Sequence, residues 1–155
     1  MNTSEKLNWL SKDFIELLAS LSPEMKGRWG VMNAHQMVEH MSYSLRQANG
    51  KENKKLLTSS ENLEKMRAFM LSDRPFKENT KNIELPEIPT PAIKSSMQES
   101  IEELKAEIID LIEYHKSNPG IRLMNPFFGE MDFEEWIHLF HKHAIHHAKQ
   151  FGLVD

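Results

Sequence analysis

Four segments of the chain carry apolar residues at spacings of three and four, and this pattern restricts the fold more than any other feature. The segments lie within residues 7–21, 33–49, 91–117 and 132–151. Such spacing puts the apolar side chains on one side of an α-helix, and that side must be buried against another element. Four helices of this kind are best buried in an antiparallel four-helix bundle, so we expect an all-α fold.

Capping signals mark the start of three of these helices. Asn33 is followed three residues later by Gln36, and Asp132 is followed at the same spacing by Glu135. Both pairs match the capping box, in which each side chain accepts a hydrogen bond from the other residue's backbone N–H. Pro91 is favoured at the first position of a helix. We therefore expect the second, third and fourth main helices to begin at these residues.

One extra short helix and two connections complete the expected fold. Ser60 is expected to cap the short helix, whose inner side consists of Leu63, Met66, Phe69 and Met70. Residues 72–90 form a long connection before the third main helix. We interpret this connection as a crossover or as a lid over a site, because loops of this length are usually functional or disordered. Residues 121–131 are expected to form a loop, and no strand is predicted.

Length and composition indicate one soluble domain over residues 1–155. The apolar share of 39% and the charged share of 27% are typical of a globular protein. The sequence has no apolar run that could cross a membrane and no signal-peptide pattern, so we expect a cytoplasmic protein without a membrane partner. The absence of cysteine excludes thiolate ligands, and the net charge of -4 argues against a nucleic-acid partner.

Five of the eight histidines lie in the last predicted helix, between residues 138 and 147. His143 and His147 are four residues apart, which places them about 40° apart on a helical wheel. Trp136 and Phe140 fall on the same side, so this pair faces the core. Two imidazoles at this spacing can bind one metal ion, although hydrogen bonds could also satisfy their ring nitrogens.

A third histidine, His40, lies at the edge of the apolar side of the second helix. It could complete a three-histidine metal site, because bundle cores assemble metal sites from facing helices. His138 and His141 fall on the opposite side of the last helix and are expected at the surface, as is His35 on the second helix. His146 lies on the flank and is expected beside the ligands.

Two common classes of metalloenzyme are excluded by the spacing of the acidic residues. Ala144 follows His143, so the H-E-x-x-H pattern of metalloproteases is missing. The E-x-x-H pairs of a di-iron carboxylate bundle do not recur either.

Three motifs resemble the DinB-like superfamily of metal-binding four-helix bundles. They occur in the expected order and span most of the chain: 37–41 (MVEHM) after Trp29, 125–131 (NPFFGEM) with 135–136, and 143–150 (HAIHHAKQ). The run 32–37 (MNAHQM) is similar to a subgroup to which no activity is assigned.

The resemblance implies a divalent metal ion, zinc or nickel, held by His40, His143 and His147. It also implies a homodimer. Characterised relatives activate a low-molecular-weight thiol for S-transfer, or perform isomerisation or hydrolysis. Ala144 and Ala148 differ from the acidic and basic residues that many relatives carry there, so the resemblance points to no particular transferase.

Two functional hypotheses follow. In the first, the protein is a metal-dependent enzyme whose metal ion activates a thiol or water, with an S-transferase-like or hydrolase-like reaction on a small-molecule substrate. In the second, it is a non-catalytic binding or dimerisation module that the metal merely stabilises, for instance in a stress response. An open coordination position would favour the enzyme, and a fourth protein ligand would favour the module.

Overall fold

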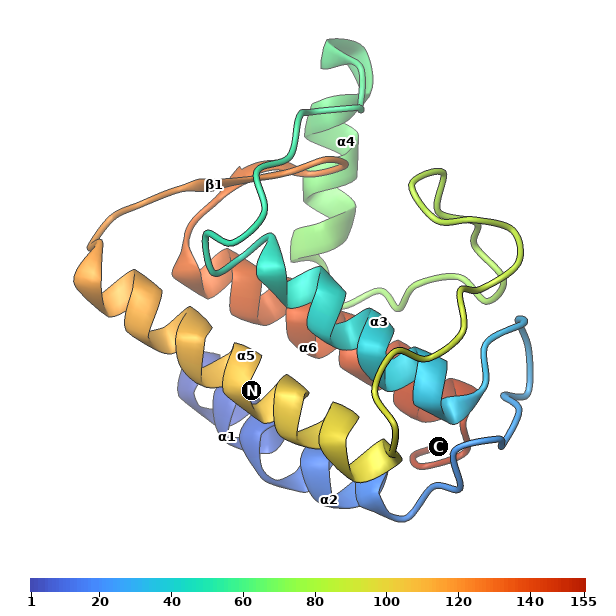
Figure 1. The fold of residues 1–155 in the computed structure, drawn as a ribbon. Coiled ribbons are helices and arrows are strands. Elements are labelled where there is room, and N and C mark those ends of the chain that lie inside the picture. The colour runs from blue at the N-terminus through green and yellow to red at the C-terminus, as the bar shows by residue number, and fades with distance from the viewer.

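Helices make up most of the regular structure in the computed structural model, which describes residues 1–155 (Figure 1). The one sheet has two short antiparallel strands. The elements are α1 (Thr3–Ser11), α2 (Asp13–Ala19), α3 (Ala34–Arg46), α4 (Ser60–Leu71), α5 (Met97–Ser117), β1 (Leu123–Asn125), β2 (Gly129–Met131) and α6 (Phe133–Gln150). No helix is both long enough and apolar enough to cross a membrane.

The two predicted capping boxes are confirmed. The Asn33 side chain accepts a hydrogen bond from the N–H of Gln36 at 2.8 Å, and the Gln36 side chain accepts one from the N–H of Asn33 at 2.9 Å. Asp132 and Glu135 make the same reciprocal pair at the start of α6. These boxes satisfy backbone donors that have no partner inside the helix. They therefore fix where the two histidine-bearing helices begin.

The first helix is divided in two, and one predicted helix start is wrong. The first helix begins at Thr3, where Asn2 and Glu5 form a capping box, and it is interrupted at Lys12. The helix α5 begins at Met97 rather than at Pro91, with Ser96 as its N-cap. The residues before Met97 bind α3 instead, because the Glu39 carboxylate accepts hydrogen bonds from the backbone N–H groups of residues 93 and 94.

The predicted loop over 121–131 contains a hairpin, so the expectation of a fold without strands is also wrong. Leu123 pairs with Met131, and Asn125 pairs with Gly129. The Asn125 side chain accepts hydrogen bonds from the N–H groups of two turn residues. Gly129 has a φ of 82°, a left-handed conformation that glycine adopts without strain. Strands of three residues are too short to show an alternating pattern in the sequence.

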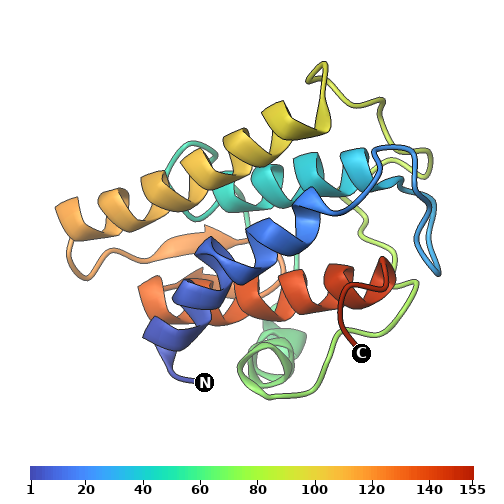
Figure 2. The ribbon, with the colours of Figure 1, turned by 90° about the horizontal axis from the view of Figure 1, so that it is seen from below.

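The helices α3 and α5 lie side by side and run in the same direction (Figures 1 and 2). His35 near the start of α3 bonds Ser100 near the start of α5, and His115 near the end of α5 bonds the carbonyl of Ala48, just after α3. The connection 72–96 carries the chain back to the end of the molecule where α3 begins. The interpretation of this connection as a crossover is therefore confirmed.

The helices α1 and α6 also run in the same direction, whereas α3 and α6 run in opposite directions (Figure 2). Lys6 contacts His138, and Trp9, one turn further along α1, contacts His141, one turn further along α6. The expected antiparallel order therefore holds for α3 against α6 but not for every neighbouring pair. The crossover is the physical reason: because it makes α3 and α5 parallel, the last helix runs in the same direction as the first.

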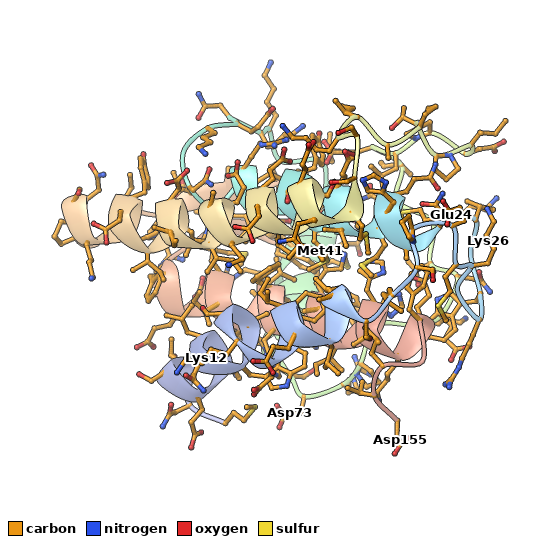
Figure 3. All side chains as sticks on the ribbon, turned by 60° about the horizontal axis from the view of Figure 1, so that its bottom comes forward. Lys12, Glu24, Lys26, Met41, Asp73 and Asp155 are labelled. Carbon is orange, nitrogen blue, oxygen red and sulfur yellow. The ribbon has the colours of Figure 1, made fainter.

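One apolar core lies between α1, α2, α3, α5 and α6. Met41, labelled in Figure 3, is fully buried between the helices, while Lys12 and Asp73 lie at the edge of the molecule. The largest fully buried side chains come from every one of these helices: Leu10, Phe14, Leu18, Met37, Leu45, Leu104, Leu111 and Ile137. Burial of such side chains is the main term that stabilises the fold.

Two adjacent isoleucines of α5 test this assignment of the core. Ile108 is 4% exposed and Ile109 is 58% exposed. We expect Ile108→Ala to lower the free energy of unfolding by about 2–5 kcal/mol, since it removes buried methyl groups and leaves a cavity. The matched Ile109→Ala should change it by less than about 0.5 kcal/mol. Urea unfolding measures both, and equal effects would contradict the packing of α5.

Candidate metal centre

The three predicted ligands lie together where α3 and α6 meet. The Nε2 atoms of His40 and His143 are 3.1 Å apart, and those of His143 and His147 are 2.9 Å apart. One nitrogen from each ring lies within 4.8 Å of the others, close enough to hold one metal ion. The structure thus brings His40 together with His143, which lies 103 residues further along the chain, and with its neighbour His147.

Local structure explains how the rings converge. His143 and His147 lie one turn apart on α6, with ring centroids separated by 4.6 Å. His40 lies on α3 between the buried residues Met37 and Met41. Its ring packs edge-on against both other rings, with centroid separations of 4.9 and 5.1 Å. The packing of α3 on α6 therefore positions the third nitrogen.

The spacing of the nitrogens fits a divalent cation. A zinc ion with bonds of about 2.0–2.1 Å to nitrogen holds its tetrahedral ligands about 3.3–3.4 Å apart, and right-angled ligands at that bond length lie about 2.9 Å apart. The separations of 2.9 and 3.1 Å fall at or just inside this range. The ligand nitrogens of the third pair, His40 and His147, lie within 4.8 Å of each other.

The chemistry of the donor set supports the same fit. A neutral imidazole carries one N–H, so a close contact between two Nε2 atoms needs a proton on one of them. The Nε2 of His143 faces the Nε2 atoms of both His40 and His147. A single proton on the His143 nitrogen would have to be shared between these two acceptors. A cation would accept a lone pair from each ring.

Burial keeps these rings neutral, as metal ligation requires. It lowers the pKa of His40 from 6.5 to about 4, with a smaller contribution from charge on His146. Burial likewise holds the pKa values of His143 and His147 well below 6.5, and the neighbouring histidines add to the effect. The charged form of an imidazole is disfavoured when its water is removed and other cations are near.

Aromatic rings surround the three histidines. The Phe76 ring, from the crossover connection, packs edge-on against His143 and His146 with centroid separations of 6.3 and 6.0 Å. His146 also contacts Trp29 and His147. The expected place of His146 beside the ligands is confirmed. Phe76 carried no functional signal in the sequence, because its ring has no chemical group that marks a site, and Trp29 was noted only as part of the first motif.

Gln150 is a polar neighbour of the site to which the sequence assigned no role. Its Oε1 lies 2.7 Å from Nδ1 of His147, and its Nε2 donates to the carbonyl of Trp29 at 2.8 Å. The side chain is buried. Its spacing of three residues from His147 and its place at the end of the motif 143–150 were the available signals, since residues three apart on a helix can meet.

Three further histidines lie away from the three ligands and are less exposed than expected. His138 and His141 are half-buried under α1, where His138 contacts Lys6 and His141 packs on Trp9. His35 is buried and bonds Ser100. The wheel placed these side chains on the correct side of each helix, but α1 and α5 also cover those sides.

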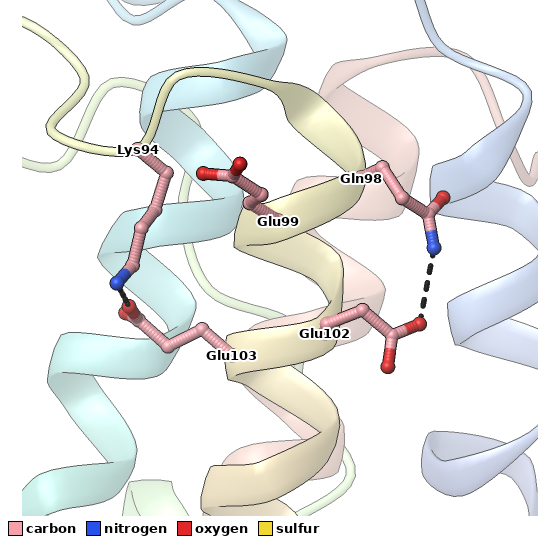
Figure 4. Close-up of a pocket in the computed structure, with 5 residues that line it drawn as sticks. All are labelled: Lys94, Gln98, Glu99, Glu102 and Glu103. Carbon is pink, nitrogen blue, oxygen red and sulfur yellow. Dashed lines mark hydrogen bonds and ion pairs between the residues drawn. The ribbon is translucent and has the colours of Figure 1, made fainter.

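A separate surface hollow of about 460 Å³ lies on α5 and contains none of the three histidines (Figure 4). Lys94 pairs with Glu103, and Gln98 donates to Glu102. These interactions within the hollow account for most of its polar groups.

Comparison with protein-family models, curated proteins and solved structures finds no match to this chain.

Acid should destabilise the metal-free protein through these rings. Unfolded histidine titrates near 6.5 and folded His40 near 4, so the unfolded state binds more protons between these values. Stability is then present above pH 6.5 and is lost as the pH falls. Between pH 7 and 5, His40 alone should lower the free energy of unfolding by about 2 kcal/mol.

Urea unfolding in the presence of a chelator measures this loss. His40→Gln should reduce the difference between pH 7 and pH 5. A wild-type protein with equal stability at both pH values would show that these rings are not buried in the neutral form.

Proposed function

We propose that this chain is a DinB-like four-helix-bundle protein in which His40, His143 and His147 hold one divalent metal ion. The single observation that carries the proposal is the convergence of one ring nitrogen from each of the three histidines within 4.8 Å. Neutral, partly to fully buried imidazoles at this spacing are a ligand set for a cation. The motifs that resemble this superfamily include all three residues.

Zinc or nickel is the metal that suits this ligand set. Imidazole nitrogen is a good donor for both, whereas magnesium and calcium prefer oxygen ligands. The candidate group contains three histidines and no carboxylate.

The activity that we propose is metal-dependent activation of a small thiol or of water, leading to an S-transferase-like or hydrolase-like reaction. When bound, the metal would lower the pKa of such a group and so supply a nucleophile at neutral pH. Catalytic zinc sites characteristically have three protein ligands and an open position, which is the number of histidines here. Phe76 and Trp29 would help to exclude bulk water from the ligands.

A metal-stabilised binding or dimerisation module is the second candidate. The crossover connection favours it by exposing three isoleucines, because Ile83, Ile88 and Ile93 are 80%, 82% and 89% exposed. Exposed apolar side chains gathered in one segment can mark an interaction site. In this case a homodimer would bury them, and the metal would only hold α3 against α6.

Metal content tests the ligand assignment. We expect the purified wild-type protein to bind about one zinc or nickel ion per chain, and His40→Ala, His143→Ala and His147→Ala each to lose it, because two imidazoles alone hold a divalent ion weakly. His141→Ala is the matched control on the same helix, and it should keep the metal. Elemental analysis after gel filtration gives the stoichiometry. Full metal content in all four variants would refute the site.

The visible spectrum of the cobalt-loaded protein distinguishes the enzyme from the module. If a coordination position is open, 2-mercaptoethanol should change the spectrum in a saturable way at neutral pH. A spectrum that stays the same at all thiol concentrations would indicate a closed site and favour the module. The oligomeric state, measured by light scattering for the wild type and for Ile88→Ser, then tests whether the exposed isoleucines join two chains.

A further inference from the structure

We propose that Gln150 is a positioning residue that selects the tautomer of His147 and aims its Nε2 lone pair at the other two histidines. The inference concerns the ring proton of His147 in the metal-free protein, and its effect on metal affinity rests on the proposed function. Two contacts of the Gln150 side chain and the two glycines around it carry the argument.

The orientation of the Gln150 amide follows from the carbonyl of Trp29. A carbonyl oxygen can only accept a hydrogen bond, so the group that lies 2.8 Å from it must be the NH₂ of the amide. The other atom of the amide, Oε1, therefore faces His147. The reversed amide would set its oxygen against the carbonyl oxygen of Trp29, with no hydrogen between them.

The tautomer of His147 follows from the orientation of the amide. Oε1 of Gln150 can only accept, and it lies 2.7 Å from Nδ1 of His147, so Nδ1 must carry the proton. A neutral imidazole has one N–H, which leaves Nε2 with a free lone pair. That Nε2 is the atom 2.9 Å from Nε2 of His143. The hydrogen bond to Gln150 thus leaves the ligand nitrogen ready to bind a cation.

The loop of residues 27–30 is shaped around the Gln150 side chain. A Cβ atom on Gly27 would lie 2.8 Å from Cγ of Gln150, and one on Gly30 would lie 2.7 Å from its Nε2. The backbone N–H of Arg28 also donates to the carbonyl of Gln150 at 2.7 Å. Only residues without a side chain allow the loop to approach this closely. The loop therefore fixes both the place and the orientation of the amide.

Burial makes the contact specific. Gln150 is 3% exposed and His147 is 5% exposed, so water does not compete freely for the ring proton. If the acceptor is removed, the proton can move to Nε2, where it blocks the lone pair that faces His143. Neighbours that hydrogen-bond a ligand histidine in this way typically change metal affinity by 10–100-fold when they are lost.

The experiment combines imidazole nitrogen shifts with zinc affinity. The ¹⁵N shifts of His147 in the chelator-treated protein at pH 7.5, assigned by comparison with His147→Ala, report which nitrogen carries the proton. We expect Nδ1–H in the wild type and a shift toward Nε2–H in Gln150→Leu. Competition with a chromogenic chelator should show about 10–100-fold weaker zinc binding for Gln150→Leu.

Three further variants separate positioning from general damage to the fold. Gln150→Glu keeps an acceptor for His147, so it should keep the Nδ1–H tautomer and most of the zinc affinity. Gln47→Leu makes the same change at a buried glutamine at the end of α3, and it should match the wild type. Gly27→Ala should displace the Gln150 side chain without removing it, so it should also weaken zinc binding. This variant tests the inference even if Gln150→Leu does not fold.

Two results would overturn the inference: an unchanged Nδ1–H tautomer in Gln150→Leu, or zinc binding by Gln150→Leu equal to that of Gln47→Leu. If the wild type bound no zinc, the proposed function would be wrong. The nitrogen shifts of the metal-free protein would still support or overturn the assignment of the tautomer.

Discussion

The contact between α3 and α6 is the interaction on which the site depends. It brings His40 to 3.1 Å from His143 and removes three imidazoles from bulk water. Desolvation of a polar ring costs free energy unless both its nitrogens find partners. The apolar core that joins the helices must offset this cost in the metal-free protein, and a bound cation would return part of it. Stability and the proposed function are therefore set at the same helix contact.

The connections of the fold are also placed around this contact. The crossover lets α5 start beside the beginning of α3 (Figure 1). On its way it lays Phe76 against His143. The loop before α3 reaches the end of α6, where its glycines approach Gln150. These segments lie at one end of the molecule because α3 and α6 run in opposite directions. The helices supply the nitrogens, and the connections supply the surroundings that keep them neutral and oriented.

A metal site would also explain why the Nε2 atoms of His40 and His147 both face the Nε2 of His143. His138, His141 and His35 each pack against a residue from another helix, as ordinary buried histidines do. The three candidate ligands face one another instead. Burial lowers the pKa values of all three rings, and charge on neighbouring histidines lowers them further. A cluster of this kind is easily explained by a cation and poorly by packing alone.

The sequence alone determined the helical character, the capping of α3 and α6, and the side of its helix on which each of the three candidate ligands lies, because these depend on local periodicity and on side-chain direction along a helix. It could not determine that α3 and α5 run in the same direction, that residues 91–96 bind Glu39 instead of beginning a helix, or that Gln150 holds His147. Each of these depends on atoms that are far apart in the chain. Only the packed structure decided which of several locally acceptable partners each group has.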